Sequence, residues 1–112
     1  MKYMMFVVVD PDAEATPREE DISIEEWLAD VESRGRRITG DRLRPTSDAT
    51  TVQISKGEVL VTDGPFTESK EWIAGFDILE CENLDEAIQI AVRHPQANGG
   101  KIELRPFWPM DE

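Results

Sequence analysis

The side chains best suited to chemistry in this chain are two carboxylates and one guanidinium. Glu103 and Arg105 are two residues apart, so on a strand they share one face about 7 Å apart. A guanidinium fork fits a carboxylate or phosphate group, and a carboxylate can accept a proton. In one interpretation Arg105 binds an anionic group of a small ligand, and Glu103 or Asp63 is the proton acceptor. In the other, the charges form a structural ion network that includes Asp77.

Asp63 begins the run Asp63-Gly64-Pro65-Phe66, which lies between two strand-like segments. A structural turn accounts for these residue types, because Asp accepts local backbone hydrogen bonds, Gly widens the accessible dihedral angles and Pro fixes the turn. The functional alternative is that the turn presents the Asp63 carboxylate and a backbone amide at the mouth of a binding cavity. Phe66 would then be a packing anchor.

The chain has one histidine, His94, and one cysteine, Cys81. His94 precedes a proline at an expected helix end, which favours a capping or dipole contact; a catalytic or haem-ligand role is the alternative. A lone cysteine can form neither an intrachain disulfide nor a thiolate metal site by itself, so we expect Cys81 in the core. The sequence also lacks the common nucleotide-binding, hydrolase and zinc-protease motifs. It therefore predicts no metal and no cofactor.

Composition favours a single acidic globular domain over residues 1–112. Hydrophobic residues make up 39% of the chain, charged residues 32%, and the formal net charge is −12. Such a charge repels polyphosphate, which argues against nucleic-acid binding. No apolar run reaches the roughly 18 residues of a membrane helix. We expect a cytoplasmic protein that binds neither nucleic acid nor membrane.

Apolar periodicity predicts the elements that position these side chains. Residues 3–9 are continuously apolar with three successive valines, which is typical of a central strand buried on both faces. Residues 50–55 and 58–62 alternate around a Lys-Gly turn and predict a hairpin. Residues 72–79 and 102–105 are expected to be the remaining strands.

Two helices are predicted between these strands. Ser23 and Glu26 have the spacing of a capping box, and Gly35 is the expected left-handed stop. Asn83 should cap the second helix, which ends at His94. The order strand, helix, several strands, helix, strand predicts an α+β fold. We expect a ferredoxin-like sandwich, with a mainly antiparallel sheet and both helices on one face.

Two helices can cover only one face of such a sheet. The first and fifth strands present apolar residues on both sides, so the other face would be a large hydrophobic patch. A second copy packed sheet against sheet around a twofold axis is the simplest cover. The sequence thus predicts a homodimer with a barrel-like interior. Glu103 and Arg105 should face that interior, together with Asp77.

Motifs along the chain resemble those of a known family. Residues 61–66 (VTDGPF), followed by Glu68-Ser69-Lys70-Glu71 and Gly75-Phe76, resemble the signature of the DGPF family within the YCII-related proteins. Further similarity at residues 40–45, 49–52, 84–87 and 102–106 extends the resemblance over nearly the whole chain. The resemblance implies a dimeric α+β barrel. It implies no particular reaction, because none is generally established for the family.

The resemblance also bears on function. Related YCII proteins are associated with enzyme chemistry through a His and Asp pair near the start of the chain. The only histidine here is His94, so that pair is missing. Members that resemble this chain are often encoded beside alternative sigma factors. This implies, as an alternative to a small-molecule ligand, a regulatory protein partner.

Three functional hypotheses therefore stand side by side. The first is a homodimeric barrel that binds a small anionic molecule, with proton transfer or isomerisation as its chemistry if it is an enzyme. The second is a non-catalytic regulatory or interaction module whose contact surface is the acidic segment of residues 10–21. The third is that the interior charges only lock the dimer.

Overall fold

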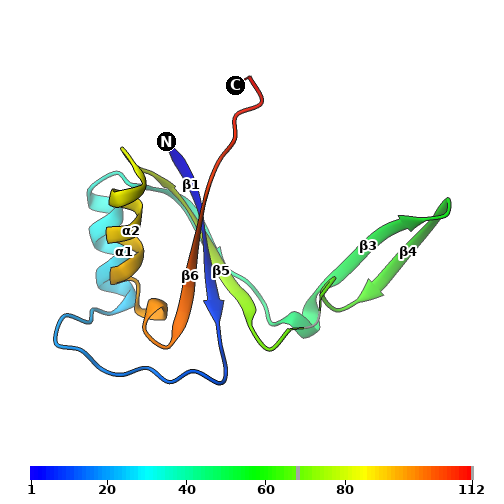
Figure 1. The fold of residues 1–112 in the computed structure, drawn as a ribbon, viewed down its shortest axis with the longest axis horizontal. Helices are drawn as coiled ribbons and strands as arrows, with labels where there is room; N and C mark the ends of the chain where they lie inside the picture. Colours follow the sequence, from blue (N-terminus) through cyan, green and yellow to red (C-terminus); the bar gives the residue numbers. More distant parts are fainter. Residues whose placement is uncertain (68, 112) are drawn as a thin grey trace.

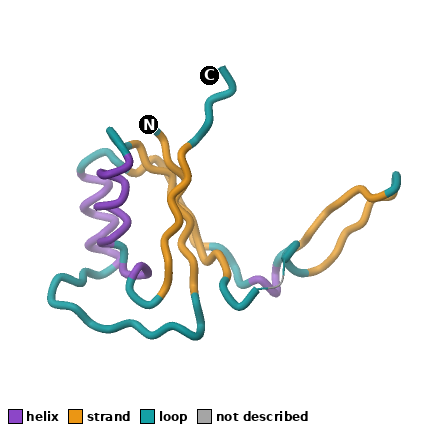
Figure 2. Tube along the Cα trace, viewed as in Figure 1, coloured by secondary structure: helices purple, strands orange, loops and turns teal. Residues whose placement is uncertain are grey.

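The computed structural model describes residues 1–67 and 69–111 (Figure 1); Glu68 of the sequence motif and the terminal Glu112 lie outside the described residues. The elements are β1 (Lys2–Val9), α1 (Ile24–Ser33), β2 (Arg37–Arg42), η1 (Thr46–Asp48), β3 (Thr50–Ser55), β4 (Glu58–Asp63), β5 (Trp72–Glu80), α2 (Leu84–Arg93), η2 (Pro95–Ala97) and β6 (Gly100–Pro106). Both helices pack on one face of the sheet (Figures 1 and 2). This arrangement confirms the predicted α+β class.

The main sheet has four strands in the order β2-β5-β1-β6. All three strand pairings in it are antiparallel, and β1 is central as predicted. If β3 and β4 are set aside, the chain runs β-α-β-β-α-β, which is the ferredoxin-like topology. The hairpin is thus an insertion between two paired strands of that fold.

The helix boundaries follow from their caps. The Ser23 hydroxyl accepts a hydrogen bond from the Glu26 backbone N–H at 3.1 Å, and the Ser23 N–H donates to the Glu26 carboxylate at 3.2 Å. Gly35, with φ of +67°, follows the end of α1. The Asn83 side chain accepts from the Glu86 N–H at 2.9 Å at the start of α2. The predicted capping box, helix stop and second cap are all confirmed.

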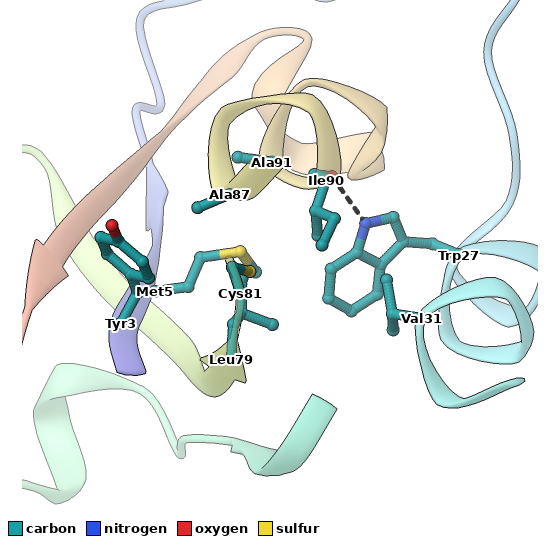
Figure 3. Packing of buried hydrophobic residues seen from close by; sticks show 9 residues of the cluster. All are labelled: Tyr3, Met5, Trp27, Val31, Leu79, Cys81, Ala87, Ile90 and Ala91. Atoms are coloured by element: carbon teal, nitrogen blue, oxygen red, sulfur yellow. Dashed lines mark hydrogen bonds between the residues drawn. The ribbon is translucent and has the colours of Figure 1, made fainter. Parts of the chain in front are cut away.

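The core lies between the helices and the sheet (Figure 3). The Trp27 indole N–H donates to the Ile90 carbonyl at 2.9 Å, which ties α1 to α2. Cys81 is buried in the same cluster, as expected, and burial raises the pKa of its thiol. The buried hydrophobic residues are Tyr3, Met5, Trp27, Val31, Leu79, Cys81, Ala87, Ile90 and Ala91.

Strand β2 is an element that the sequence did not predict. Its six residues, RITGDR, include only one large apolar side chain, so neither strand nor helix periodicity stands out. The strand forms because its backbone pairs with β5 at the edge of the sheet. Tertiary pairing therefore overrides the weak local signal.

The predicted hairpin forms, but β3 and β4 make a separate two-stranded sheet instead of joining the main one. Figure 1 shows the hairpin leaving the main sheet on the side away from the helices and diverging from it. The chain measures 52 × 41 × 19 Å along its principal axes. Neither of the helices in the described part of the chain is long and apolar enough to span a membrane.

Candidate functional site

The sheet face opposite the helices has an apolar centre. Strand register places three pairs of residues from β1 and β5 on this face: Met4 and Ile78, Phe6 and Phe76, and Val8 and Ile73. Most of these side chains are only half-buried, and Ile73 is exposed. We call this surface the open face.

Glu103 and Arg105 lie on the open face, as the alternation predicts. Glu103 is paired with Phe6 and Arg105 with Met4, whereas Ile102 packs against the helix-side core. The Arg105 guanidinium donates a hydrogen bond from Nη2 to the Glu103 carboxylate at 2.8 Å. It also lies over the Phe6 ring, 5.7 Å from the centroid. The pair therefore combines a charged tip with an apolar floor.

A hollow of about 1240 Å³ lies over one end of the open face. Its floor includes Phe6 and Val8 of β1, and one side is formed by residues of β6. Opposite them are the turn residues Gly64–Thr67 and the 3-10 turn Thr46–Asp48. The hollow thus joins the sequence motif to the charged face of β6.

The motif turn is held in place by two backbone contacts. The Gly64 N–H donates to the Ala49 carbonyl at 2.7 Å, and the Thr51 hydroxyl donates to the Gly64 carbonyl at 2.7 Å. Gly64 has φ of +101°, a conformation that other residues rarely adopt. The glycine of the motif is therefore explained by the turn. Phe66 is exposed, so the expected anchor has no packing site within the described residues of this chain.

Three cations line the hollow, and each has a carboxylate nearby. The first pair is Arg105 with Glu103. In the others, Lys101 contacts the Glu71 carboxylate, and Arg44 Nη1 lies 3.7 Å from the Asp48 carboxylate. The hydrogen bond that Lys101 donates to the Glu71 carboxylate raises the pKa of Lys101. Exposed pairs of this kind are weak, because water screens them. An anionic ligand can therefore compete with the carboxylates for the cations.

Asp77 does not face the open side, so the predicted ion network with Glu103 and Arg105 is wrong in this respect. It lies on the helix-covered face with Leu79 and is only 6% exposed. Burial raises the pKa of its carboxyl group, and the opposing effect of the Arg37 guanidinium is smaller. The sequence alone predicts Asp77 in the interior of a dimer, because a buried charge needs a partner. The structure supplies that partner on the helix side, where the Arg37 guanidinium offsets the cost of burying the carboxylate.

His94 also lies on the helix side, away from Arg105. It is buried, its ring packs edge-on against Trp27 with centroids 4.8 Å apart, and its Nδ1 accepts from the Gln96 N–H at 3.0 Å. This contact caps the start of the 3-10 turn η2, whereas the sequence favours a capping or dipole contact at the end of the preceding helix. Desolvation lowers the pKa of His94 to about 4, so the ring is neutral near pH 7 and carries its proton on Nε2.

Asp77 and His94 line a second hollow of about 800 Å³ on the helix side, together with Arg37. Asp63 lines neither hollow; it is an exposed residue at the end of β4, paired with Thr50. The structure therefore brings Glu103 and Arg105 together and separates them from the other candidate residues.

Sequence reasoning missed two groups in the first hollow. Lys101 continues the alternation of Glu103 and Arg105, so that signal was present in the sequence. Glu71 and the η1 turn carry no periodic signal, because their position depends on how the loops return to the sheet. Among the described residues, no three His, Cys, Asp or Glu side chains converge as metal ligands would.

Comparison with known proteins agrees with the family resemblance of the sequence. The profile of the YCII-related domain matches residues 1–111, and the chain belongs to this family. An uncharacterised protein of Rhizobium meliloti (strain 1021) is 46% identical over 68 residues. That match covers 59% of this chain and 55% of the relative, so the chain spans about half the length of the curated relative it matches.

Proposed function

We propose that this YCII-related protein is a homodimer that binds a small anionic molecule on its open face, with Arg105 as the main ligand-binding residue. The observation that carries the proposal is the place of the Arg105 guanidinium, beside a hollow and over the Phe6 ring. An apolar floor with a few polar groups is the usual composition of a small-molecule site. A second subunit over the open face would exclude water from it.

The geometry of Arg105 favours an anion with two oxygens. In the single subunit its guanidinium makes one contact with Glu103, through Nη2. A carboxylate or phosphate group can accept two parallel hydrogen bonds from a guanidinium, which is a stronger arrangement than one contact. Lys101 is on the same face, four residues before Arg105, so it adds positive charge. The site thus selects for negative charge in an otherwise acidic protein.

Glu103 gives the site its potential for chemistry. Its carboxylate is at hydrogen-bonding distance from Arg105, so an anion held by Arg105 would place its neighbouring atoms near this proton acceptor. Proton transfer or isomerisation on the bound molecule is the reaction that this pair supports. His94 belongs to the opposite side of the sheet and has no part in this step.

The test compares Arg105→Lys with a matched change, Arg34→Lys, at the C-cap of α1. Calorimetric titration with inorganic phosphate and with succinate measures binding, and sedimentation equilibrium measures assembly. We expect Arg105→Lys to weaken binding about 10-fold or more, because lysine keeps the charge but loses the fork. The dimer should remain intact. Arg34→Lys should leave both measurements unchanged.

Two results would count against the proposal. Equal binding by the wild type and Arg105→Lys would remove Arg105 from the site. The second result has two parts: the wild type binds no anion, and Arg105→Lys dissociates into single subunits. It would show that the charges of Arg105 and Glu103 only stabilise the dimer.

A further inference from the structure

The β3–β4 hairpin has one aliphatic face that is uncovered in the single subunit. Register pairs Val52 with Val61 and Ile54 with Val59, so these four side chains lie on the same side of the hairpin. They are 65–73% exposed. An isolated two-stranded hairpin is at best marginally stable in water. A hairpin with this composition therefore needs a surface against which its aliphatic face can pack.

The open face of the main sheet is the second uncovered apolar surface of the same chain. The hairpin does not fold onto it: Figure 1 shows the two diverging from the turn where they join. The hydrogen bonds between Ala49 and Gly64 and between Thr51 and Gly64 close the root of the hairpin, and the Leu43 N–H donates to the Ala74 carbonyl on β5 at 2.8 Å. These contacts anchor the hairpin to one end of the sheet.

We infer that the β3–β4 hairpin is an arm that packs its aliphatic face on the open face of a second copy, so that each subunit closes the hollow of its partner. This inference rests on the proposed homodimer and adds a component to its site. The arm leaves the sheet on the side where a partner packed sheet against sheet would stand. Two arms exchanged about a twofold axis cover both uncovered surfaces of both copies at once.

Charge complementarity also favours a second copy over an unrelated partner. On its aliphatic face the hairpin carries one carboxylate, Asp63, whereas Glu58 lies on the opposite face and Lys56 lies in the turn at the tip. Strand β6 carries the opposite balance on the open face, with Lys101 and Arg105 against Glu103. Opposite charges on the two surfaces attract even though the whole chain is acidic.

The register gives Asp63 a specific place in this arrangement. It is paired with Thr50 and lies two residues beyond Val61, so it shares the aliphatic face. Its carboxylate therefore faces the partner subunit, and it is a positioning residue for the cations of the open face. In the single subunit Asp63 lines no hollow, so its contribution to a site depends on the second copy.

A mixed sample of labelled and unlabelled protein tests the exchange directly. Equal amounts of ¹³C-labelled and unlabelled chain are unfolded, mixed and refolded, and isotope-filtered NOE spectra then report only contacts between subunits. We expect intermolecular contacts from the methyl groups of Val52, Ile54, Val59 and Val61 to the rings of Phe6 and Phe76. Contacts that occur only within one chain would show that the hairpin folds back, and would overturn the inference. A dimer without any such contact would overturn it as well.

Two neighbouring residues of β3 give a matched pair of variants. Ile54 lies on the aliphatic face and Gln53 on the opposite one, and both are exposed in the single subunit. Ile54→Lys should raise the dissociation constant of the dimer roughly 100-fold, because the new charge would be buried without a partner. Gln53→Lys adds the same charge on the other face and should change the constant less than about threefold. Equal effects of the two variants would contradict the arm.

The same pair of variants, tested for phosphate binding, separates this inference from the ligand proposal. Phosphate binding that persists in the dimer of Gln53→Lys but weakens in single subunits of Ile54→Lys supports both. Intermolecular contacts from the arm with no phosphate binding in the wild type would support the arm and overturn the ligand site. Phosphate binding at Arg105 without intermolecular contacts from the arm would support the ligand site and overturn the arm.

Discussion

The Arg37 guanidinium donates from Nε to the Asp77 carboxylate at 2.7 Å and joins the edge strand β2 to β5. Arg37 Nη2 also donates to the Gly40 carbonyl of β2 itself at 2.8 Å, which fixes the direction of the guanidinium toward Asp77. Asp77 is buried on the helix side. This ion pair explains how a strand with so little apolar character stays attached to the sheet.

Removing Arg37 should therefore be costly. Arg37→Ala leaves the buried Asp77 carboxylate without its cation, and we expect the free energy of unfolding to fall by about 3 kcal/mol. Arg34→Ala is the matched control, because its partner Asp30 is at 3.0 Å but the two side chains are 43% and 31% exposed, against 18% and 8% for Arg37 and Asp77. That change should cost less than about 1 kcal/mol. Urea unfolding measures both, and equal losses would contradict the structural role of Arg37.

Gly40 makes the approach of β2 to β5 possible. A Cβ at this position would lie 2.5 Å from the Phe76 carbonyl oxygen and collide with the Asp77 carboxylate. We expect Gly40→Ala to destabilise the fold by about 2 kcal/mol, because the paired backbone must move. Thr39→Ala, one residue away and exposed, should cost about 0.5 kcal/mol or less. Thermal unfolding at one pH compares the two. A stable Gly40→Ala variant would contradict this packing.

His94 should make stability depend on pH. Its pKa is about 4 in the fold because of desolvation, against 6.5 for an ordinary histidine. Between these values the unfolded chain binds a proton that the folded chain does not, so stability increases with pH. The contribution is complete above pH 6.5 and is lost as the pH falls toward 4, by up to about 3 kcal/mol.

The His94 prediction has a direct and an indirect measurement. The NMR titration of the ring protons should show a midpoint near pH 4. His94→Asn retains a side-chain oxygen that can cap the Gln96 N–H but removes the titration, so the pH dependence of its stability between 5 and 6.5 should be shallower than that of the wild type. Identical slopes, or a midpoint near 6.5, would show that the ring is not desolvated.

Trp27 connects the two helices through a single hydrogen bond inside the core. Trp27→Phe removes the donor to the Ile90 carbonyl and leaves a gap beside Val31 (Figure 3). We expect a loss of about 2 kcal/mol in the free energy of unfolding, from the unpaired carbonyl and the lost packing. Trp108→Phe is a suitable control, because that side chain is exposed. A similar loss in both variants would argue against the bridge.

Much of the fold could be predicted because its signals are local. Ser23 with Glu26 and Asn83 with Glu86 identify the starts of both helices, and the continuous apolar run of residues 3–9 indicates the central strand. Strand β2 had no such signal, since pairing with β5 determines it. The alternation of residues 50–62 predicted a hairpin, but it cannot show which surface the hairpin packs against.

The candidate site could be predicted only in part, for similar reasons. The alternation on β6 correctly placed Glu103 and Arg105 opposite the helices. The side of Asp77 was wrong, because its partner Arg37 is forty residues away in the sequence. The rim of the hollow, formed by Gly64–Thr67 and Thr46–Asp48, depends on long-range loop positions. Local patterns carry no information on these.

The proposed function depends on anion binding by Arg105 on the open face. The most direct measurement is the Nε–Hε resonance of Arg105 during a titration of the wild-type protein with inorganic phosphate. We expect this resonance to shift in a saturable way, while that of Arg34, the C-cap residue of α1, shows no saturation. An Arg105 resonance that stays unchanged, or that drifts in parallel with Arg34, would contradict the proposed site.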